Sequence, residues 1–355
     1  MLRLTDPRSP VLLYANFIND TPADTGENGS NMTDTWLVTG GAGYIGAHVV
    51  RSLQAAGAQA VVIDDLSTGD LRRVEVPFVE GDIADRELVA DTLRQHRITG
   101  VVHLAADKQV AESMRHPLAY YRRNVFNLMQ LLDAMAQAGV AKLVFSSSAA
   151  VYGMVDSAQV REDHPTQPIN PYGETKLIGE WLIRDQARAT GLRFAALRYF
   201  NVAGTAAPEL GDLGRSNLIP MVFDALARGD QPVIFGGRHP TPDGTCVRDF
   251  IHVQDLADAH VAAIATLDSP GAGHVFNVGC GRGYSVREVI EMVAEVSGRS
   301  IAPLVGEARP GDPAMVVADT AHISATLGWR PRHDLREMVR SAWHAQPQQL
   351  SAAQS

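Results

Sequence analysis

Short apolar runs alternate with longer segments of helical periodicity between residues 34 and 200 of the chain. In the helical segments, for example between Val49 and Gly57, apolar positions recur about every 3.6 residues. Strands that alternate with helices in this way form a parallel sheet covered on both faces. We therefore predict an α/β fold with a doubly wound parallel sheet. Its predicted strands are residues 36–39, 60–63, 77–79, 101–104, 143–146 and 194–199.

The regular alternation ends near residue 200. Beyond it prolines and glycines are more frequent, which predicts a smaller C-terminal α/β lobe over residues 201–345. Ser285 and Glu288 have the spacing of a capping box and predict the start of a helix in this lobe. Residues 34–200 form the first predicted domain, to which we expect residues 246–268 to return.

Both ends of the chain lack the pattern of a folded core. Residues 1–33 are polar and rich in turn-forming residues, which predicts a flexible extension. Residues 346–355 are rich in Gln, Ala and Ser and predict a frayed tail.

The composition excludes several classes of protein. Of the 355 residues, 45% are hydrophobic and 20% are charged, as in ordinary globular proteins, and the net charge is −9. This acidity disfavours nucleic acid or an anionic membrane as a partner, although a few local arginines still suffice for an anionic small ligand. No apolar run is long enough for a membrane span, and no export signal is evident. The two cysteines, Cys246 and Cys280, form no metal-type pair or disulfide framework, so we expect a cytoplasmic protein without a metal site.

Three glycines stand between the first predicted strand and the first predicted helix. Gly40, Gly43 and Gly46 allow a sharp turn and a close approach of the backbone to a pyrophosphate, which a Cβ atom would obstruct. The start of the helix, at Tyr44 and Ile45, then directs N–H groups and the positive end of its dipole at the phosphates. The sequence therefore predicts a Rossmann-type dinucleotide site.

The predicted cofactor is NAD. The second strand ends at Asp64 and Asp65, and an acid at this place binds the adenine-side ribose hydroxyls and repels the 2′-phosphate of NADP. Later strand ends supply the other cofactor positions, which are Asp82 and Ile83 after the third strand and Leu104 and Ala105 after the fourth.

Tyr172 and Lys176 lie four residues apart at the start of a predicted helix, directly after Pro171. This spacing places both side chains on one face of the helix. A free tyrosine has a pKa of about 10 and is a poor base at neutral pH. We expect the Lys176 ammonium and a positive nicotinamide to lower this pKa by about three units, roughly 4 kcal/mol. Because the Ser-rich stretch Ser146–Gly153 adds a hydroxyl at the same cleft, the sequence predicts NAD-dependent redox chemistry on an alcohol.

At these motifs the chain resembles the extended short-chain dehydrogenase/reductase family, and within it the sugar-nucleotide 4-epimerases. The resemblance covers residues 34 to about 342. It rests on the stretches Thr39–Gly46, Ser146–Gly153, Pro171–Lys176, Arg198–Asn201, Asp243–Val253 and Arg309–Asp312.

The resemblance implies a role for each matched residue. Ser148 would bind the sugar O4, Tyr172 would act as acid and base, and Lys176 would hold Tyr172 and the nicotinamide ribose. Further cofactor-contacting positions are Lys108, Asn124, Ser146 and Phe200. The positions that would hold UDP are Asn201, Asn217, Leu218, Val233, Phe235, Arg248, Arg309 and Asp312.

The implied reaction interconverts UDP-galactose and UDP-glucose. Tyr172 takes the proton of the 4-hydroxyl while C4 gives a hydride to NAD⁺. The 4-keto sugar then turns, and hydride and proton return to its other face, so NAD is not consumed. Arg248 and Arg309 would anchor the diphosphate during the turn.

Three positions depart from the family pattern. Asn127 replaces a glycine, which we expect to alter helix–sheet packing rather than chemistry, and Phe250 replaces a tyrosine near the nucleotide. Val316 stands where some members carry a bulky tyrosine beside the sugar. The smaller side chain leaves room for a 2-N-acetyl group, so UDP-GlcNAc and UDP-GalNAc are further candidate substrates.

Other functions stay open at this point. A UDP-sugar decarboxylase or a uronate 4-epimerase would share the Ser/Tyr/Lys set. A 4,6-dehydratase would need Asp and Glu before Val151, where this chain has Ala149 and Ala150. A non-catalytic NAD-sensing regulator would typically have lost the Tyr/Lys pair, which is intact here.

The resemblance also implies a homodimer, through helices around Tyr120–Ala136 and Gly173–Ile183. Four apolar positions of the first helix fit either this interface or the core, and the pattern does not choose between the two: Leu128, Leu131, Leu132 and Met135.

Overall fold

The computed structural model describes residues 34–155, 157, 159–212, 214, 217–309 and 311–346. The predicted extension, residues 1–33, and residues 347–355 of the predicted tail lie outside this part of the chain. No helix of the described residues is long and apolar enough to cross a membrane. Both cysteines are free thiols.

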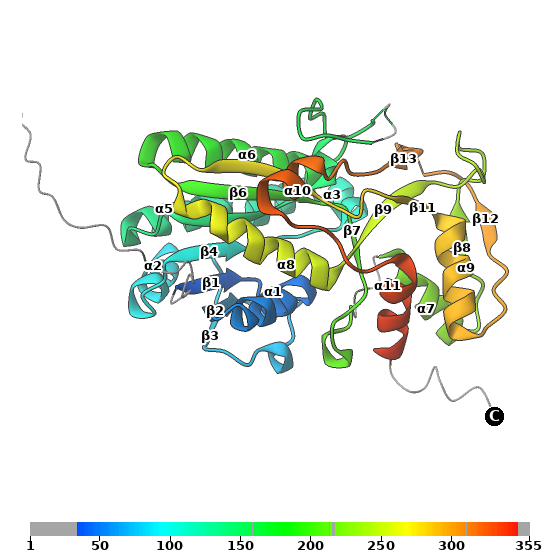
Figure 1. The fold of residues 1–355 in the computed structure, drawn as a ribbon, viewed down its shortest axis with the longest axis horizontal. Coiled ribbons are helices and arrows are strands. Elements are labelled where there is room, and N and C mark those ends of the chain that lie inside the picture. The colour runs from blue at the N-terminus through cyan, green and yellow to red at the C-terminus, as the bar shows by residue number, and fades with distance from the viewer. Residues whose placement is uncertain are drawn as a thin grey trace, which may run out of the picture. The chain divides into compact units, whose positions relative to one another are not determined.

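The larger sheet of the described chain consists of seven parallel strands (Figure 1). Their order is β10-β6-β5-β4-β1-β2-β3, so β1 lies inside the sheet and the chain winds outward on both sides of it. The direction of winding changes between β1 and β4, and ligands of such sheets bind beyond the carboxyl ends of the strands at this switch point. The bounds are β1 (Thr35–Thr39), β2 (Gln59–Asp64), β3 (Phe78–Glu80), β4 (Gly100–His103), β5 (Lys142–Ser148), β6 (Arg193–Tyr199) and β10 (Gly273–Val278).

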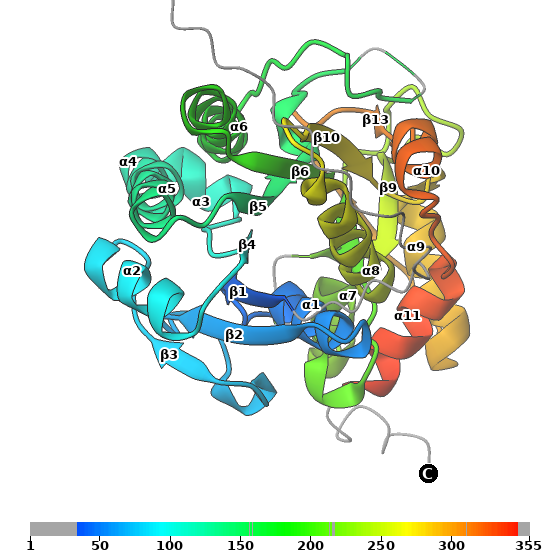
Figure 2. The ribbon, with the colours of Figure 1, turned by 60° about the vertical axis from the view of Figure 1, so that its left-hand side comes forward.

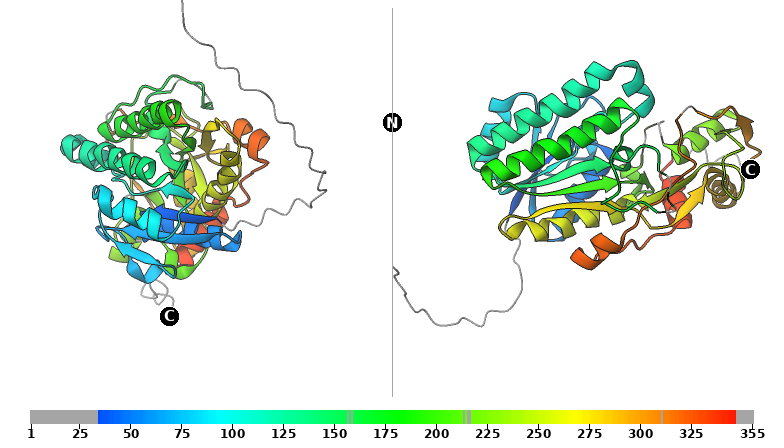
Figure 3. Two further views of the ribbon diagram at one scale, coloured as in Figure 1. Left: turned by 90° about the vertical axis from the view of Figure 1, so that its left-hand side faces the viewer. Right: turned by 90° about the horizontal axis from the view of Figure 1, so that it is seen from above.

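Helices cover both faces of this sheet (Figure 2). One face carries α2 (Arg86–Gln95), α5 (Asn127–Ala138) and α6 (Pro171–Thr190), and the other carries α1 (Tyr44–Ala55) and α8 (Val253–Ile264). Helices α5 and α6 run side by side (Figure 3).

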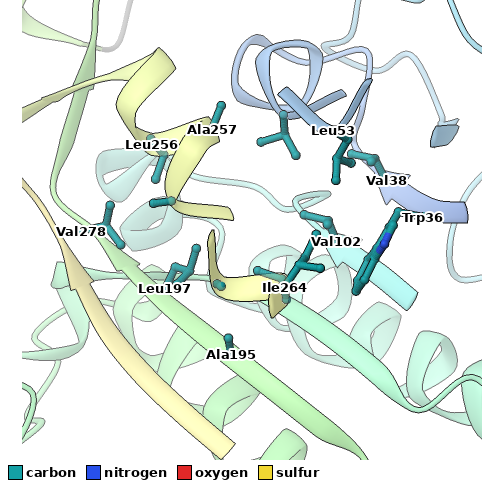
Figure 4. Close-up of a cluster of buried hydrophobic side chains, with 14 of the residues drawn as sticks. Trp36, Val38, Leu53, Val102, Ala195, Leu197, Leu256, Ala257, Ile264 and Val278 are labelled. Atoms are coloured by element: carbon teal, nitrogen blue, oxygen red, sulfur yellow. The ribbon is translucent and has the colours of Figure 1, made fainter. Parts of the chain in front are cut away.

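Alternate residues of β1 enter different cores, because successive strand residues point to opposite faces. Trp36 and Val38 pack on the α1 and α8 side, in a cluster with Leu53 and Leu256 (Figure 4). Leu37 packs on the α2, α5 and α6 side. Each large apolar side chain buried in this way stabilises the fold by about 1.5–3 kcal/mol.

Helix α6, which carries Tyr172 and Lys176, begins at an asparagine N-cap and ends at a glycine C-cap. The Asn170 side chain accepts a hydrogen bond from the Gly173 amide at 2.9 Å, and Pro171 occupies the first turn as predicted. Gly191 ends the helix with a φ of 76°, which favours glycine.

A smaller lobe follows β6. Its sheet contains β7 (Asn201–Ala203), β9 (Val247–His252), β11 (Gly283–Ser285) and β13 (Met315–Val316), and a separate parallel pair consists of β8 (Val233–Phe235) and β12 (Leu304–Gly306). Helices α7 (Leu218–Arg228), α9 (Val286–Ser297) and α11 (Leu335–His344) share a core with these strands around Phe223, Ile290 and Met338. The predicted capping box of Ser285 and Glu288 is confirmed at the start of α9.

The remaining elements are short. They are α3 (Val110–Arg115), α4 (Pro117–Tyr120), α10 (Ala321–Leu327), a π-helical turn at Tyr121–Phe126, and 3₁₀ turns at Leu71–Arg73, Ala149–Val151, Pro208–Leu210 and Ala265–Asp268. The π-helical turn joins α4 to α5 without a break in the helical backbone.

The predicted α/β fold and its six strands are confirmed. Strand β10 was not predicted, although it forms one edge of the larger sheet. Residues 246–268 divide between the two parts, because β9 pairs in the smaller sheet whereas α8 packs against α1. The division at residues 34–200 and 201–345 stays a prediction. Four uncertain apolar positions of α5 belong to the core: Leu128, Leu131, Leu132 and Met135.

Candidate active site

The glycine turn after β1 is closed too tightly for side chains. Gly40 has a φ of 71° and its amide donates to the Ile63 carbonyl at 2.9 Å. A Cβ on Gly40 would lie 2.8 Å from the Ala105 nitrogen, and a Cβ on Gly46 would lie 2.2 Å from the Gly40 oxygen. Only glycine fits these two positions without a shift of the backbone.

Helix α1 begins at this turn with amide groups available to a ligand. Gly43 is its N-cap and, in the described part of the chain, no side chain caps its first turn. The amides of Tyr44, Ile45 and Gly46 have no acceptor within the helix, as is general for a first turn. Their N–H groups and the helix dipole therefore suit a diphosphate.

Two carboxylates close β2, as predicted. Asp64 accepts hydrogen bonds from the amides of Ala42 (3.0 Å) and Leu66 (2.9 Å), which fixes its carboxylate beside the glycine turn. Burial raises the pKa of Asp64, partly offset by these hydrogen bonds. Asp65 accepts from the amide and hydroxyl of Ser67.

Asp82 follows β3 and is hydrogen-bonded to Asn127, one of the three residues that depart from the family pattern. Its carboxylate accepts from the Ala84 amide at 2.9 Å and from the Asn127 side chain at 3.0 Å. Ile83 beside it is buried. Asn127 therefore contacts a predicted cofactor residue, and the expectation that it alters packing rather than chemistry stays a prediction.

Asn124 joins the loop after β4 to the start of α6. Its side chain accepts from the Asp107 amide at 2.8 Å and donates to the Asp107 carbonyl at 2.9 Å. It also donates to the Thr175 hydroxyl at 3.0 Å, and Thr175 donates to the Tyr172 carbonyl at 2.8 Å. Asn124 therefore positions the helix that carries Tyr172, whereas Lys108 in the same loop is exposed.

The carboxyl end of β4 adjoins the glycine turn. The Thr39 hydroxyl accepts from the amides of Leu104 (3.2 Å) and Ala105 (3.3 Å), and it pairs with Nδ1 of His103 at 2.7 Å. This places Leu104 and Ala105 at the predicted cofactor edge. Phe200 is buried in a separate cluster at the end of β6, with Val151, Tyr152 and Leu177.

Ser148, Tyr172 and Lys176 come together at the carboxyl end of β5. The Lys176 Nζ atom donates to the Ser146 carbonyl at 2.8 Å and lies 6.0 Å from the centre of the Tyr172 ring. The Ser148 hydroxyl accepts from the Ala150 amide at 3.2 Å and is hydrogen-bonded to Tyr172. The arrangement on one face of α6 is as predicted.

The electrostatics of this group differ from the expectation. Burial raises the pKa of Tyr172, and the hydrogen bond with Ser148 opposes this increase. Burial also lowers the pKa of Lys176 to about 7, so its positive charge is only partly present at neutral pH. Among the protein's own groups the expected lowering of the Tyr172 pKa by Lys176 is therefore not found, and the lowering expected from a positive nicotinamide stays a prediction.

A cavity of about 230 Å³ lies in the smaller lobe, beyond the end of β6. Its wall includes Asn201, two residues beyond Tyr199, which pairs with Ser148 in the larger sheet. Ser148, Tyr172 and Val316 do not line it. Eight of the predicted substrate residues do: Asn201, Asn217, Leu218, Val233, Phe235, Arg248, Arg309 and Asp312.

Two arginines, Arg248 and Arg309, line the cavity and could bind an anion. Arg248 forms an ion pair with Asp312 and donates to the Val247 carbonyl at 2.8 Å. The Arg309 guanidinium lies 4.0 Å from the centre of the Phe235 ring. A cation against an aromatic face and two arginines in one cavity suit a nucleoside diphosphate.

Other cavity residues were missed or misplaced by sequence reasoning. Asp212 and Ala342 line it without a motif signal, and so does Gln346, which the sequence placed in the tail; Cys246 lines it from the stretch Asp243–Val253 but was not predicted as a site residue. The amide of Tyr44 stays a predicted cofactor contact, while its buried hydroxyl donates to the Gly204 carbonyl at 2.5 Å and its side chain lines the cavity. Phe250, a noted departure, lines it as well.

The residues present fit a dinucleotide. The glycine turn excludes side chains, the first turn of α1 offers free amides, and Asp64 stands at the ribose end. With the Ser148–Tyr172–Lys176 group at the adjacent strand ends, this arrangement defines an NAD-binding enzyme of the short-chain dehydrogenase type.

Comparison with known proteins narrows this class. Residues 36–279 match the NAD dependent epimerase/dehydratase family, and the chain belongs to that family. A UDP-glucose 4-epimerase of Azospirillum brasilense is 50% identical, with 86% of this chain and 90% of that protein covered.

Two solved structures share the fold. A UDP-glucose-4-epimerase from Stenotrophomonas maltophila, with bound NAD and formylated UDP-arabinopyranose, has a TM-score of 0.84 and 42% identity over 87% of this chain and 97% of that chain. The UDP-Glc/GlcNAc 4-epimerase from Campylobacter jejuni has a TM-score of 0.78 and 38% identity over 88% and 98%. The predicted family, its NAD dependence and its epimerase class are thus confirmed.

Proposed function

We propose that this protein is an isomerase that interconverts UDP-galactose and UDP-glucose by transient oxidation at C4 of the hexose. The observation that carries the proposal is the contact of Tyr172 with Ser148 at the end of β5, with Lys176 on the same helix face. The neighbouring cavity with its two arginines suits the nucleotide half of such a substrate. The relatives named above are epimerases of UDP-sugars.

The chain's own groups move the proton. The Tyr172 oxygen takes the proton of the 4-hydroxyl, and the Ser148 hydroxyl holds O4 in place through its free hydrogen-bonding capacity. Lys176, fixed by the Ser146 carbonyl, lies with its Nζ atom 6.0 Å from the centre of the Tyr172 ring and adds positive charge there in the fraction of molecules in which it is protonated. Bound NAD⁺ supplies the acceptor, and later the donor, of the hydride at C4. The inversion is complete when C4 regains its hydride on the opposite face and Tyr172 returns the proton to O4.

The two arginines keep the nucleotide in place while the sugar turns. Arg248 and Arg309 offer several donors to the diphosphate, and charge-assisted hydrogen bonds of this kind are stronger than neutral ones. The 4-keto sugar is linked to the diphosphate by single bonds, so it can rotate without dissociation of the nucleotide.

A second candidate substrate class is the UDP-N-acetylhexosamines. Val316 of β13 pairs in register with Arg248 and packs against the buried cluster that contains Val151 and Phe200, near the catalytic strand end. Its short side chain leaves more room than the tyrosine of some family members. The similar Campylobacter jejuni protein is named for both Glc and GlcNAc substrates.

The assembly we propose is a homodimer through α5 and α6. The outer faces of this pair of helices and of the preceding turn expose Phe126, Met129 and Trp181, although their inner faces are buried in the core. An exposed apolar patch on two adjacent helices suits a second copy of the chain. A cytoplasmic location accords with the two unpaired thiols.

A panel of UDP-hexoses, UDP-N-acetylhexosamines and UDP-uronic acids tests the proposal. We expect UDP-galactose to give UDP-glucose without added NAD, and UDP-GalNAc to give UDP-GlcNAc. A decarboxylase, a uronate 4-epimerase or a 4,6-dehydratase would give products from other members of the panel, and a regulator would give none. Tyr172→Phe is expected to lower kcat at least a thousandfold and to retain bound NAD. Full activity of that variant would exclude the mechanism.

A further inference from the structure

Arg198 of β6 has no role in the steps above, although it lies in one of the motifs that carry the family resemblance. It is 4% exposed, and its guanidinium forms a two-pronged ion pair with Glu180 of α6, which is 1% exposed. The two hydrogen bonds measure 2.9 Å from Nε and 2.7 Å from Nη2. A buried ion pair is costly to desolvate and gives little net stability, so its presence between helix and sheet calls for another reason.

Glu180 also accepts a hydrogen bond from the Ser147 hydroxyl, at 2.5 Å. Ser147 lies between Ser146, whose carbonyl accepts from Lys176, and Ser148, which contacts Tyr172. The Glu180 contact is therefore the middle one of three between α6 and the last residues of β5.

The three α6 residues in these contacts follow each other at intervals of four. Tyr172, Lys176 and Glu180 consequently share one face of the helix. Each is joined to a different residue of the end of β5: Tyr172 to Ser148, Lys176 to Ser146, and Glu180 to Ser147. A shift of the helix along the strand would break all three contacts together.

The other side of Arg198 is tied to the loop after β5. Its Nη1 atom donates to the Tyr152 hydroxyl at 2.9 Å and to the Glu162 carbonyl at 3.1 Å. The Tyr152 hydroxyl in turn donates to Asn277 of β10 at 2.6 Å. The ion pair is thus connected to α6, β5, β6 and β10 at the edge where the chemistry takes place.

We propose that Ser147, Glu180 and Arg198 form a buried ionic clasp that fixes the register of α6 against β5, and that they are positioning residues for Ser148, Tyr172 and Lys176. The proposal rests on the proposed function, since it assigns the clasp to the geometry of that reaction. None of the three residues needs to touch the substrate. Their effect is on the distance between the Tyr172 oxygen and the sugar hydroxyl, to which the rate of proton transfer is highly sensitive.

Ser147→Ala tests this with the least damage to the fold, because it removes only the hydroxyl that links the ion pair to β5. We expect kcat for UDP-galactose to fall about tenfold, while KM and the dissociation constant of UDP change by less than twofold. Ser147→Thr keeps a hydroxyl and is expected to recover most of the rate. A matched control is Ser297→Ala in α9, which removes an equally buried hydroxyl that donates to the Val293 carbonyl at 2.6 Å and should leave kcat unchanged.

A second variant separates positioning from stability. Glu180→Leu combined with Arg198→Met replaces the ion pair by apolar side chains, an exchange that proteins often tolerate. We expect a folded protein with a melting temperature close to that of the wild type and kcat at least tenfold lower. Wild-type kcat in this variant or in Ser147→Ala would overturn the proposal, and so would equal losses in Ser147→Ala and Ser297→Ala.

Hydrogen exchange gives a readout that does not depend on turnover. In Ser147→Ala, amides of residues 142–153 and 171–180 should exchange faster than in the wild type, with residues 286–297 unchanged. If the wild type itself does not turn over UDP-galactose, the proposed function fails, and the exchange data still decide whether the clasp exists. Unchanged exchange in both segments would refute the clasp alone.

Discussion

Lys176 illustrates at the scale of a single residue how a catalytic position is kept at the expense of stability. Its ammonium is almost completely buried, with the Ser146 carbonyl as a hydrogen-bond acceptor, and burial lowers its pKa from 10.5 to about 7. The unfolded chain binds the proton more tightly, so below pH 7 the full cost of the buried charge opposes folding. This cost decreases as the pH rises from 7 toward 10.5.

Lys176→Met should therefore stabilise the fold while it removes activity. The lowered pKa corresponds to a cost of up to about 5 kcal/mol, and the Ser146 carbonyl left without its donor returns about 1–3 kcal/mol of it. We expect the variant to be about 2 kcal/mol more stable than the wild type in urea at pH 6.5, with cofactor removed from both. The difference should shrink by pH 9.5. A destabilised variant at pH 6.5 would show that the lysine is not buried in its charged form.

Arg309 offers a second prediction, about the anionic part of the substrate. Its guanidinium lies over Phe235 in the cavity, and hydrogen bonds to a charged partner contribute about 1.5–3 kcal/mol each. Arg309→Ala should weaken UDP binding about 10- to 100-fold and leave uridine binding unchanged, both measured by calorimetry. Arg282→Ala is the matched control, because Arg282 also lies over an aromatic ring, that of Tyr284, but does not line the cavity. Equal losses for UDP and uridine would contradict a role at the diphosphate.

Sequence reasoning located residues that belong to local motifs and missed those that depend on distant contacts. Gly40, Asp64 and the Tyr172–Lys176 pair follow from the spacing and order of elements, and the structure has them at adjacent strand ends. The raised pKa of Tyr172 could not be predicted, because it depends on burial by the whole fold. Asp212 reaches the cavity from a loop without any motif, and the hydrogen bond from Asn127 to Asp82 joins residues 45 positions apart.

At the scale of elements, the strands that alternate with helices could be predicted, whereas the strand that joins the larger sheet from a later part of the chain could not. The six predicted strands are each followed by a helix or a turn signal, whereas β10 comes after elements of the smaller lobe and enters the larger sheet beside β6. Its residues, Gly273–Val278, include polar side chains, and Asn277 is used in the network around Tyr152. A polar residue in a buried strand weakens the apolar signal that identifies such strands.

The pair α5 and α6 supports a prediction about assembly. Met129 and Trp181 are each about half exposed, on helices whose opposite faces are fully packed. Met129→Glu together with Trp181→Glu places two charges in the proposed interface, where they would be desolvated without partners. We expect the mass measured by light scattering to fall from that of a dimer to that of one chain. Leu304→Glu, at a residue as exposed on β12, serves as the control and should leave the dimer intact. A dimeric double variant would place the interface elsewhere.

At the scale of the whole molecule, stability should depend strongly on mild acid, because several histidines are buried in the neutral state. Burial lowers the pKa of His48 and His260 to about 4, and that of His103 and His252 to about 3. In His260, one ring nitrogen faces the Leu256 carbonyl at 2.8 Å and the other pairs with the Tyr199 hydroxyl, so both are used by the neutral ring. The unfolded chain takes up protons near pH 6.5, which the folded chain does not.

The buried carboxyl group of Asp249 changes the stability of the fold in the direction opposite to that of the histidines when the pH falls. Burial raises its pKa to about 7, although three backbone amides donate to it, so the folded chain binds this proton first and gains stability as the pH falls below 7. Between pH 7.5 and pH 5 each buried histidine costs about 2 kcal/mol and Asp249 returns about 2.5 kcal/mol. We expect the free energy of unfolding in urea to fall by about 5 kcal/mol over this interval. Asp249→Asn should steepen the fall and His260→Gln should reduce it by about 2 kcal/mol. A free energy independent of pH between 7.5 and 5 would mean that these histidines are hydrated in the folded protein.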